Sequence, residues 1–280
     1  MNISVIGGDL RQLTLARLLK EDGYSVKIAG FDKGLENTHK APENFWESDV
    51  LILPIPASHD GLTVNAPYSE APIPILPEKL SVNSLVLGGN ISKQLESIFD
   101  SANVKYIDYL KREELMIKNA IPTAEGAIEI AMEEMPITLH GSRCLVVGYG
   151  RIGKILSSML KGIGASVTVS ARKHSDLAWI ESRGFDSLHN IRLKESISEF
   201  DVVFNTVPAL ILDDAVLKNI NPDTLIIDLA SKPGGVDFAL AKDLGLKVIW
   251  SLGLPGKAAP ITSGKIIKDT VINILKEMEV

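Results

Sequence analysis

The stretch that decides the fold is Leu145-Val146-Val147-Gly148-Tyr149-Gly150-Arg151-Ile152-Gly153. It is a Gly-x-Gly-x-x-Gly run that follows an apolar, strand-like segment and opens a helix-like one, the context in which this pattern indicates dinucleotide binding. The first glycine allows a tight turn, the second lets the backbone approach a pyrophosphate, and the third lets the helix pack closely on the strand. The N-terminus of the helix then faces the phosphates with its free N–H groups. We expect the turn to bind the cofactor through Gly148, Tyr149, Gly150, Arg151, Ile152 and Gly153.

The next strand-like run, at 165–173, indicates which dinucleotide binds. Chains that prefer NAD usually end this strand in Asp or Glu, which binds the ribose 2′-OH. Here Ser170 stands at about that place and is followed by Ala171, Arg172 and Lys173. With two cations and no carboxylate to repel a phosphate, the sequence favours NADP, bound by Ser170, Arg172 and Lys173. The alternative is that the two cations are ordinary surface charges at a strand end.

Composition is that of a globular chain. Of 280 residues, 45% are hydrophobic and 23% are charged, which is enough for two domains with sizeable cores. The net charge of −6 argues against nucleic-acid binding. Cys144 is the only cysteine, so a disulfide within the chain is impossible. No signal-peptide pattern and no apolar run long enough for a bilayer is found, and we expect a cytoplasmic protein without a membrane partner.

Strand-like and helix-like segments alternate along the chain, which predicts an α/β fold of two Rossmann-like domains, each with a doubly wound parallel sheet, and a cleft between them. Residues 1–135 are expected to form the first domain, with a C-terminal helix at 262–280 packing back on it, and residues 136–261 the NADP-binding domain. In the first domain we expect a helix at 10–21 and strands at 3–8, 25–29, 49–53, 84–87 and 104–107. A helix at 122–139, with Pro122 near its start, links the domains. The second domain has expected helices at 151–162, 175–182 and 236–243, and strands at 143–147, 166–170, 201–205, 224–228 and 246–249.

Three loops at successive strand ends of the second domain carry further candidates. Thr206, Val207 and Pro208 follow one strand, and we expect them over the pyrophosphate and ribose. Ser231 and Lys232 follow the next strand, near the nicotinamide, and Lys257 lies on the last loop before the C-terminal helix. Both lysines are candidate carboxylate binders and catalytic residues. The alternative is solvation at loop tips.

The first domain offers a polar set for substrate binding. Arg11 stands in the first turn of the 10–21 helix, where a cation opposes the helix dipole, so a bound anion would explain it. Six prolines lie between 54 and 77, and this stiff loop after a strand is a candidate pocket wall rather than a loose surface excursion. We expect Ser58, Asn65 and Asn90 to bind substrate with Arg11 and Lys257. His59 is the best-placed proton acceptor, although a lone loop histidine is often incidental.

Absent patterns narrow the chemistry. D-2-hydroxyacid dehydrogenases share the two-domain layout but place a catalytic histidine on a late loop, and here no histidine follows His189. No Cys/His cluster suggests zinc, so we expect no metal site, and no nucleophile elbow or Walker loop occurs.

Four motifs together resemble one family. They are the Gly7-Gly8-Asp9-x-Arg11-Gln12 start, the glycine fingerprint, and the segments 119–126 (Asn-Ala-Ile-Pro-Thr-Ala-Glu-Gly) and 253–260 (Gly-Leu-Pro-Gly-Lys-Ala-Ala-Pro). Over its whole length the chain looks like the A subunit, the larger one, of dipicolinate synthase, the enzyme that makes the spore component pyridine-2,6-dicarboxylate. The resemblance implies NADP-dependent oxidation of dihydrodipicolinate, a small dicarboxylate, during sporulation, with the flavoprotein-like B subunit of dipicolinate synthase as partner and a homo-oligomeric assembly. The alternatives are an NADP-linked dehydrogenase of another keto or amino acid, as in the alanine dehydrogenase group, and a non-catalytic NADP-binding regulatory protein.

Overall fold

The computed structural model describes residues 1–36 and 38–279, and the chain divides into two compact units. The first unit contains Met1–Asn119 and Ala259–Val280, and the second contains Ala120–Ala258. The boundary therefore falls at 119/120, and the expected boundary at 135/136 is wrong. The reason is burial, because the apolar side chains of the linking helix pack into the core of the second unit from Ala124 onward.

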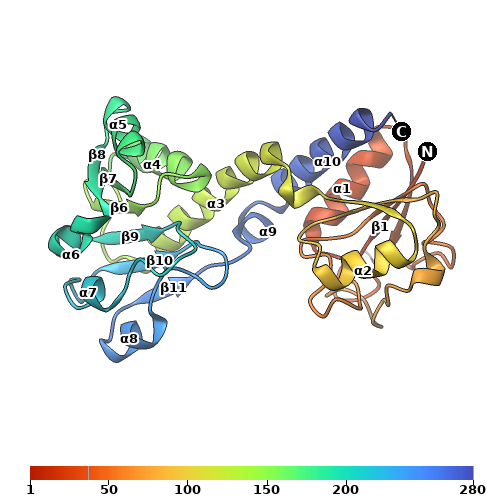
Figure 1. The fold of residues 1–280 in the computed structure, drawn as a ribbon, viewed down its shortest axis with the longest axis horizontal. Coiled ribbons are helices and arrows are strands. Elements are labelled where there is room, and N and C mark those ends of the chain that lie inside the picture. Colours follow the sequence, from red (N-terminus) through yellow and green to blue (C-terminus); the bar gives the residue numbers. More distant parts are fainter. Residues whose placement is uncertain (37, 280) are drawn as a thin grey trace. The chain divides into compact units, whose positions relative to one another are not determined.

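The first unit is built on a five-stranded parallel sheet with the strand order β2-β1-β3-β4-β5. Its strands are β1 (Asn2–Ile6), β2 (Ser25–Ala29), β3 (Val50–Ile52), β4 (Leu85–Gly88) and β5 (Lys105–Asp108). Helices α1 (Leu10–Glu21) and α10 (Pro260–Glu277) lie side by side (Figure 1) and share one hydrophobic core with a face of the sheet. Helix α2 (Lys93–Ser101) packs on the opposite face.

The proline-rich loop at 54–77 is part of this second core. Ala57, Val64, Ile73 and Ile75 are buried against the sheet. The Val64 N–H donates to the Ile73 carbonyl over 2.9 Å, and Ile75 N–H donates to Leu62 over 2.8 Å. The loop is therefore packed and internally hydrogen-bonded, and the alternative of a loose surface excursion is wrong.

The second unit is built on a six-stranded parallel sheet with the order β11-β10-β9-β6-β7-β8. Its strands are β6 (Arg143–Val147), β7 (Ser166–Ala171), β8 (Asp186–His189), β9 (Val202–Asn205), β10 (Leu225–Asp228) and β11 (Val248–Trp250). Helices α3 (Glu113–Glu134), α4 (Arg151–Ile163) and α5 (His174–Ser182) contribute to the core on one face. Helices α6 (Leu193–Ser196), α7 (Asp214–Leu217) and α8 (Phe238–Asp243) contribute to the core on the other. With helices on both faces of two parallel sheets, the predicted Rossmann-like fold class is confirmed.

Two elements differ from expectation in ways that affect the site. Helix α3 begins at Glu113, so Pro122 lies inside it rather than near its start. An interior proline costs about 3 kcal/mol, and here apolar burial on either side, as at Leu115 and Ala124, offsets that cost. The segment at 253–260 is not a plain loop, because it contains the short helix α9 (Leu254–Ala258).

Candidate functional site

The surroundings of each glycine in the fingerprint show why that position holds glycine or leaves space for a ligand. Gly148 has φ +99°, and a Cβ there would lie 2.6 Å from the Thr206 hydroxyl oxygen. A Cβ on Gly153 would overlap the Gly148 carbonyl oxygen, so helix α4 can approach strand β6 only with glycine at this position. Gly150 has nothing within 4 Å of its Cβ position. The turn is therefore tightly packed on the protein side and open at Gly150, which is the shape that a bound pyrophosphate needs.

Helix α4 presents its N-terminus at this open position. Its N-cap is Gly150, which has no side chain to cap the first turn, and the helix continues for 13 residues. Arg151 is exposed, whereas Ile152 packs partly against the core, and Tyr149 is 8% exposed with the Lys154 ammonium 5.4 Å from its ring centre. The backbone of this turn, more than its side chains, thus faces the space where an anion would bind.

The loops after β6 and β9 meet at the topological switch point of the sheet, where ligands bind in open α/β folds. The N–H and the hydroxyl of Thr206 both donate to the Val147 carbonyl, each over 2.9 Å. Thr206 and Val207 are half-buried and Pro208 is exposed. The structure thus brings Thr206 and Val207 next to the glycine turn, and Pro208 follows them on the surface of the same loop.

The end of β7 requires one correction. Ser170 is fully buried, its hydroxyl has no hydrogen-bond partner among the described residues, and its carbonyl accepts the Gly148 N–H over 2.9 Å. Because this hydroxyl oxygen is not accessible to solvent, a ribose or phosphate outside the described surface cannot reach it in this conformation. Arg172 and Lys173 are both exposed and pair with no described carboxylate. These two cations remain the candidates for the 2′-phosphate.

Two histidines stand beside these cations and were not predicted as neighbours. The rings of His174 and His189 lie 5.3 Å apart, centre to centre, and the register of the sheet pairs His189 with Ala171. His189 Nδ1 accepts the Ile191 N–H over 3.3 Å. Strand β8 has no clear pattern of apolar residues in the sequence, so the sequence alone did not predict that His189 lies next to Ala171.

A buried polar pair, Asn205 and Asp228, holds the two loops that follow β9 and β10. Both residues are fully buried, and Asn205 Nδ2 donates to Asp228 Oδ1 over 2.8 Å and to the Val207 carbonyl over 3.0 Å. The Asp228 carboxylate also accepts the N–H groups of Ala230 over 3.0 Å and Gly235 over 2.8 Å. The pair therefore fixes the positions of loops 206–208 and 229–235 relative to each other. The sequence held one signal for this pair: β9 and β10 are otherwise apolar, and each ends in a polar residue, Asn205 and Asp228.

The remaining candidates of the second unit lie on its surface. Ser231 and Lys232 are exposed in the loop after β10, and Lys257 is exposed on α9. Neither lysine forms an ion pair with a described residue. Both ammonium groups are therefore available to an anionic ligand.

In the first unit, Arg11 has a structural role that the dipole argument missed. Asp9 is the N-cap of α1, and its carboxylate accepts the Arg11 N–H over 3.0 Å and side-chain bonds from Nε over 2.9 Å and from Nη2 over 2.8 Å. Arg11 Nη2 also donates to the Ile55 carbonyl over 3.2 Å. Asp9 supplies the negative charge at the helix N-terminus, so the position of Arg11 has a structural explanation that does not require the bound anion we expected.

The neighbouring residue Gln12 ties the same helix to the same loop. It is fully buried, and its Nε2 donates to the Tyr109 hydroxyl over 3.4 Å. The Tyr109 hydroxyl in turn donates to the Leu53 carbonyl over 2.7 Å, and burial raises the pKa of Tyr109. Together with Arg11, this chain of bonds sets the backbone that leaves β3 at the switch point between β1 and β3.

Of the other candidates in the first unit, two have side chains that are hydrogen-bonded within the protein and two are exposed. The Ser58 hydroxyl donates to Asp60 and accepts the Gly61 N–H, each over 2.8 Å, so it is already engaged within a turn, and its predicted contact with substrate stays a prediction. Hydrogen bonds from Thr63 and Leu62 lower the pKa of the Asp60 carboxyl. Asn65 Nδ2 donates to the Pro56 carbonyl over 3.2 Å. His59 and Asn90 are exposed.

Two protein families match this chain, one over each of its two units. Residues 2–110 match the model of the N-terminal domain of the dipicolinate synthase A subunit, and residues 117–249 match the NAD binding domain of D-isomer specific 2-hydroxyacid dehydrogenases. The dipicolinate synthase A subunit of Bacillus subtilis is 35% identical over 288 aligned positions, covering all of this chain and 97% of the relative. The chain belongs to the family of dipicolinate synthase A subunits. This confirms the resemblance seen in the motifs.

Solved structures place the family among dehydrogenase folds. The crystal structure of the dipicolinate synthase A subunit from Bacillus halodurans has a TM-score of 0.90 at 33% identity, over 98% of this chain and 97% of that one. An L-alanine dehydrogenase has a TM-score of 0.68 at 14% identity, over 98% of this chain and 89% of that one, which shows a shared fold alone. The dehydrogenase-type domain at 117–249 indicates an oxidoreductase that uses a nicotinamide cofactor. In the part of the chain that is described, no helix has the length and apolar character needed to cross a membrane.

Proposed function

We propose that this chain oxidises dihydrodipicolinate to dipicolinate, pyridine-2,6-dicarboxylate, with NADP as the acceptor. The observation that carries the choice of NADP is the exposed pair Arg172 and Lys173 directly after β7, with no carboxylate at the end of that strand. The substrate class rests on the family. The reaction removes one hydride and one proton from the dihydropyridine ring, and the product ring is aromatic, so much of the driving force lies in the substrate.

The residues of the second unit fit a bound dinucleotide. The open position at Gly150 and the uncapped first turn of α4 would hold the pyrophosphate, with Thr206, Val207 and Pro208 beside it. Arg172 and Lys173 would hold the 2′-phosphate by charge-assisted hydrogen bonds. Bound NADP supplies a hydride acceptor, and the protein orients it.

For the substrate carboxylates we propose the exposed ammonium groups of Lys232 and Lys257. Arg11 would contribute through Nη1, because its Nε and Nη2 already bond Asp9 and Ile55. Asn65 and Asn90 are proposed polar contacts. His59 is the proposed proton acceptor because it is exposed on a loop after β3. Aromatisation makes a strong base less necessary, which suits a site in which a single loop histidine carries this role.

The test is turnover by the purified chain. Freshly prepared dihydrodipicolinate is mixed with NADP or with NAD, and NADPH or NADH formation is followed by absorbance, with dipicolinate identified by mass spectrometry. We expect faster turnover with NADP and none in Gly150→Val. Binding of NADP without turnover would favour a non-catalytic regulatory protein. Turnover of a keto or amino acid but not of dihydrodipicolinate would favour an alanine dehydrogenase-like enzyme.

We further propose that the chain works in the cytoplasm during sporulation, as a homo-oligomer together with the B subunit of dipicolinate synthase. The Bacillus subtilis relative is named as one of the enzyme's subunits, which supports a second, different subunit as partner. Co-expression of the two subunits and copurification tests this. If the chain turns over at the same rate with and without the B subunit and the two do not copurify, the partner proposal fails while the proposed reaction stands.

A further inference from the structure

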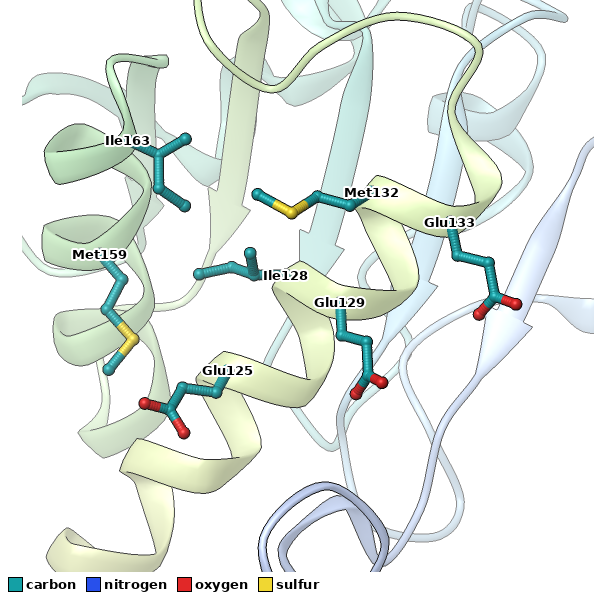
Figure 2. Close-up of a pocket in the computed structure, with 7 residues that line it drawn as sticks. All are labelled: Glu125, Ile128, Glu129, Met132, Glu133, Met159 and Ile163. Atoms are coloured by element: carbon teal, nitrogen blue, oxygen red, sulfur yellow. The ribbon is translucent and has the colours of Figure 1, made fainter.

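An open apolar groove of about 820 Å³ lies between helices α3 and α4 of the second unit. Figure 2 shows Ile128 and Met132 on α3 facing Met159 and Ile163 on α4 across it. Met132 is 55% exposed, although the groove around it is apolar. An exposed apolar groove of this kind on a globular protein marks an interaction surface.

A row of glutamates follows the α3 side of the groove. Glu125, Glu129 and Glu133 succeed one another along α3 at intervals of four residues, the spacing of neighbours on a helix surface. In Figure 2 the carboxylates of Glu129 and Glu133 point away from α4, and that of Glu125 points towards Met159. None of them forms an ion pair with a described residue. Like charges at this spacing weaken a helix slightly. The row has no balancing charge within the described chain, so a cationic surface facing it from outside would stabilise it.

The α4 side carries the opposite charge. Lys154 and Lys161 are exposed, seven residues apart, and therefore lie on one face of α4. Lys161 Nζ donates to the Gly184 carbonyl over 2.7 Å, in the turn that follows α5. That face of α4 is thus on the side away from α3. From one edge to the other, the surface runs from acidic through apolar to basic.

We propose that this groove is the interface between two copies of the chain, which gives the proposed homo-oligomer a defined surface. A two-fold axis running along the groove lays α3 of one copy over α4 of the other. The glutamate row of each copy then faces the lysines of its partner, and the four apolar side chains of both copies meet in the centre. A two-fold contact uses the same patch twice, so it requires a patch that is complementary to itself, and this one is.

The first experiment measures the oligomeric state of the full chain by sedimentation velocity over a range of concentrations. The wild type should be a dimer. Met132→Glu places a carboxylate at the apolar centre and should raise the dimer dissociation constant roughly a hundredfold or more, because the charge is buried without a partner. Val82→Glu is the matched control, since Val82 is 58% exposed and belongs to the first unit, whereas every residue that lines the groove belongs to the second. It should leave the dimer unchanged.

The second experiment exchanges charges across the interface. Glu129→Lys and Lys154→Glu should each weaken the dimer, and the double variant should recover most of the wild-type affinity. Circular dichroism and NADP titration on the same samples check that each variant is folded and binds cofactor, so a failure of this proposal is separate from a failure of the proposed reaction. A monomeric wild type, a dimer that Met132→Glu leaves intact, or a double variant as weak as the singles would overturn it. Binding of a different protein at the groove of a monomeric chain would overturn it equally.

Discussion

Alanine substitutions at Gly150 and Gly153 should give opposite results, although the two glycines stand three residues apart in one turn. At Gly153 the new methyl group overlaps the carbonyl oxygen of Gly148. That oxygen belongs to a turn whose N–H is bonded to Ser170, so the backbone has little freedom to yield. Helix α4 must instead move away from β6 and loosen the packing of Leu156 and Leu160, which are fully buried. Overpacking of this kind costs roughly 1–3 kcal/mol, and a clash with backbone belongs at the upper end.

At Gly150 the same methyl group meets nothing within 4 Å, and φ is −82°, which alanine adopts freely. The entropy that alanine removes from the unfolded chain is worth about 0.4–1 kcal/mol, while alanine is a slightly poorer N-cap than glycine. We therefore expect the stability of Gly150→Ala to lie within about 0.5 kcal/mol of wild type. The methyl group projects where a pyrophosphate would approach, so NADP affinity should fall roughly tenfold or more, and further in Gly150→Val.

The assay pairs urea unfolding, followed by circular dichroism, with calorimetric titration of NADP. Gly153→Ala should unfold at clearly lower urea, whereas Gly150→Ala should unfold with the wild type and bind NADP poorly. Wild-type stability in Gly153→Ala would refute the packing of α4 on β6. Wild-type NADP affinity in a folded Gly150→Val would show that the fingerprint is only a structural turn.

Four further outcomes are expected. Arg172→Ala should weaken NADP binding by roughly 1.5–3 kcal/mol and leave NAD binding unchanged, and equal losses in titration calorimetry would contradict the 2′-phosphate assignment. Lys257→Ala should raise KM for the dicarboxylate roughly tenfold to a hundredfold at unchanged NADP affinity, and normal steady-state kinetics would remove Lys257 from the site. Asp228→Asn sets an amide N–H against a backbone donor, Gly235 or Ala230, and should lower the free energy of unfolding by roughly 1–3 kcal/mol per unsatisfied group, so an unchanged urea midpoint would count against the network. Burial raises the pKa of the Cys144 thiol to about 11 from 9.0, so the unfolded chain loses this proton first and stability should fall by about 2–3 kcal/mol between these pH values, a component that Cys144→Ala should lack.

Local signals in the sequence predicted several elements of both units well. The strand expected at 143–147 is β6, and the helix and strand expected at 10–21 and 25–29 are α1 and β2 with the same bounds. Glycines that permit a turn, apolar spacing along a helix and the N-cap Asp9 all act within a few residues. Asp9 was also visible two positions before Arg11, and it was the signal that could have explained that cation.

What the sequence did not show depends on contacts between residues far apart in the chain. Ser170 is buried because helices cover both faces of its parallel sheet, and no alternation of apolar and polar residues then reports which face is open. His189 reaches the end of β7 only through the pairing of β8 with β7. Asn205 and Asp228 meet across 23 positions because β9 and β10 are neighbours in the sheet.

The sequence by itself thus determined the fold class, the glycine turn after β6 and the two cations after β7, because these follow from the identity and conformational preferences of nearby residues. The tertiary structure decided where the chain divides, that Pro122 lies within a helix, and which polar groups are committed to other parts of the protein. The physical reason is burial. Whether a side chain such as Ser58, Ser170 or Arg11 is free for a ligand depends on what packs against it, and those neighbours are chosen by the topology of the sheets.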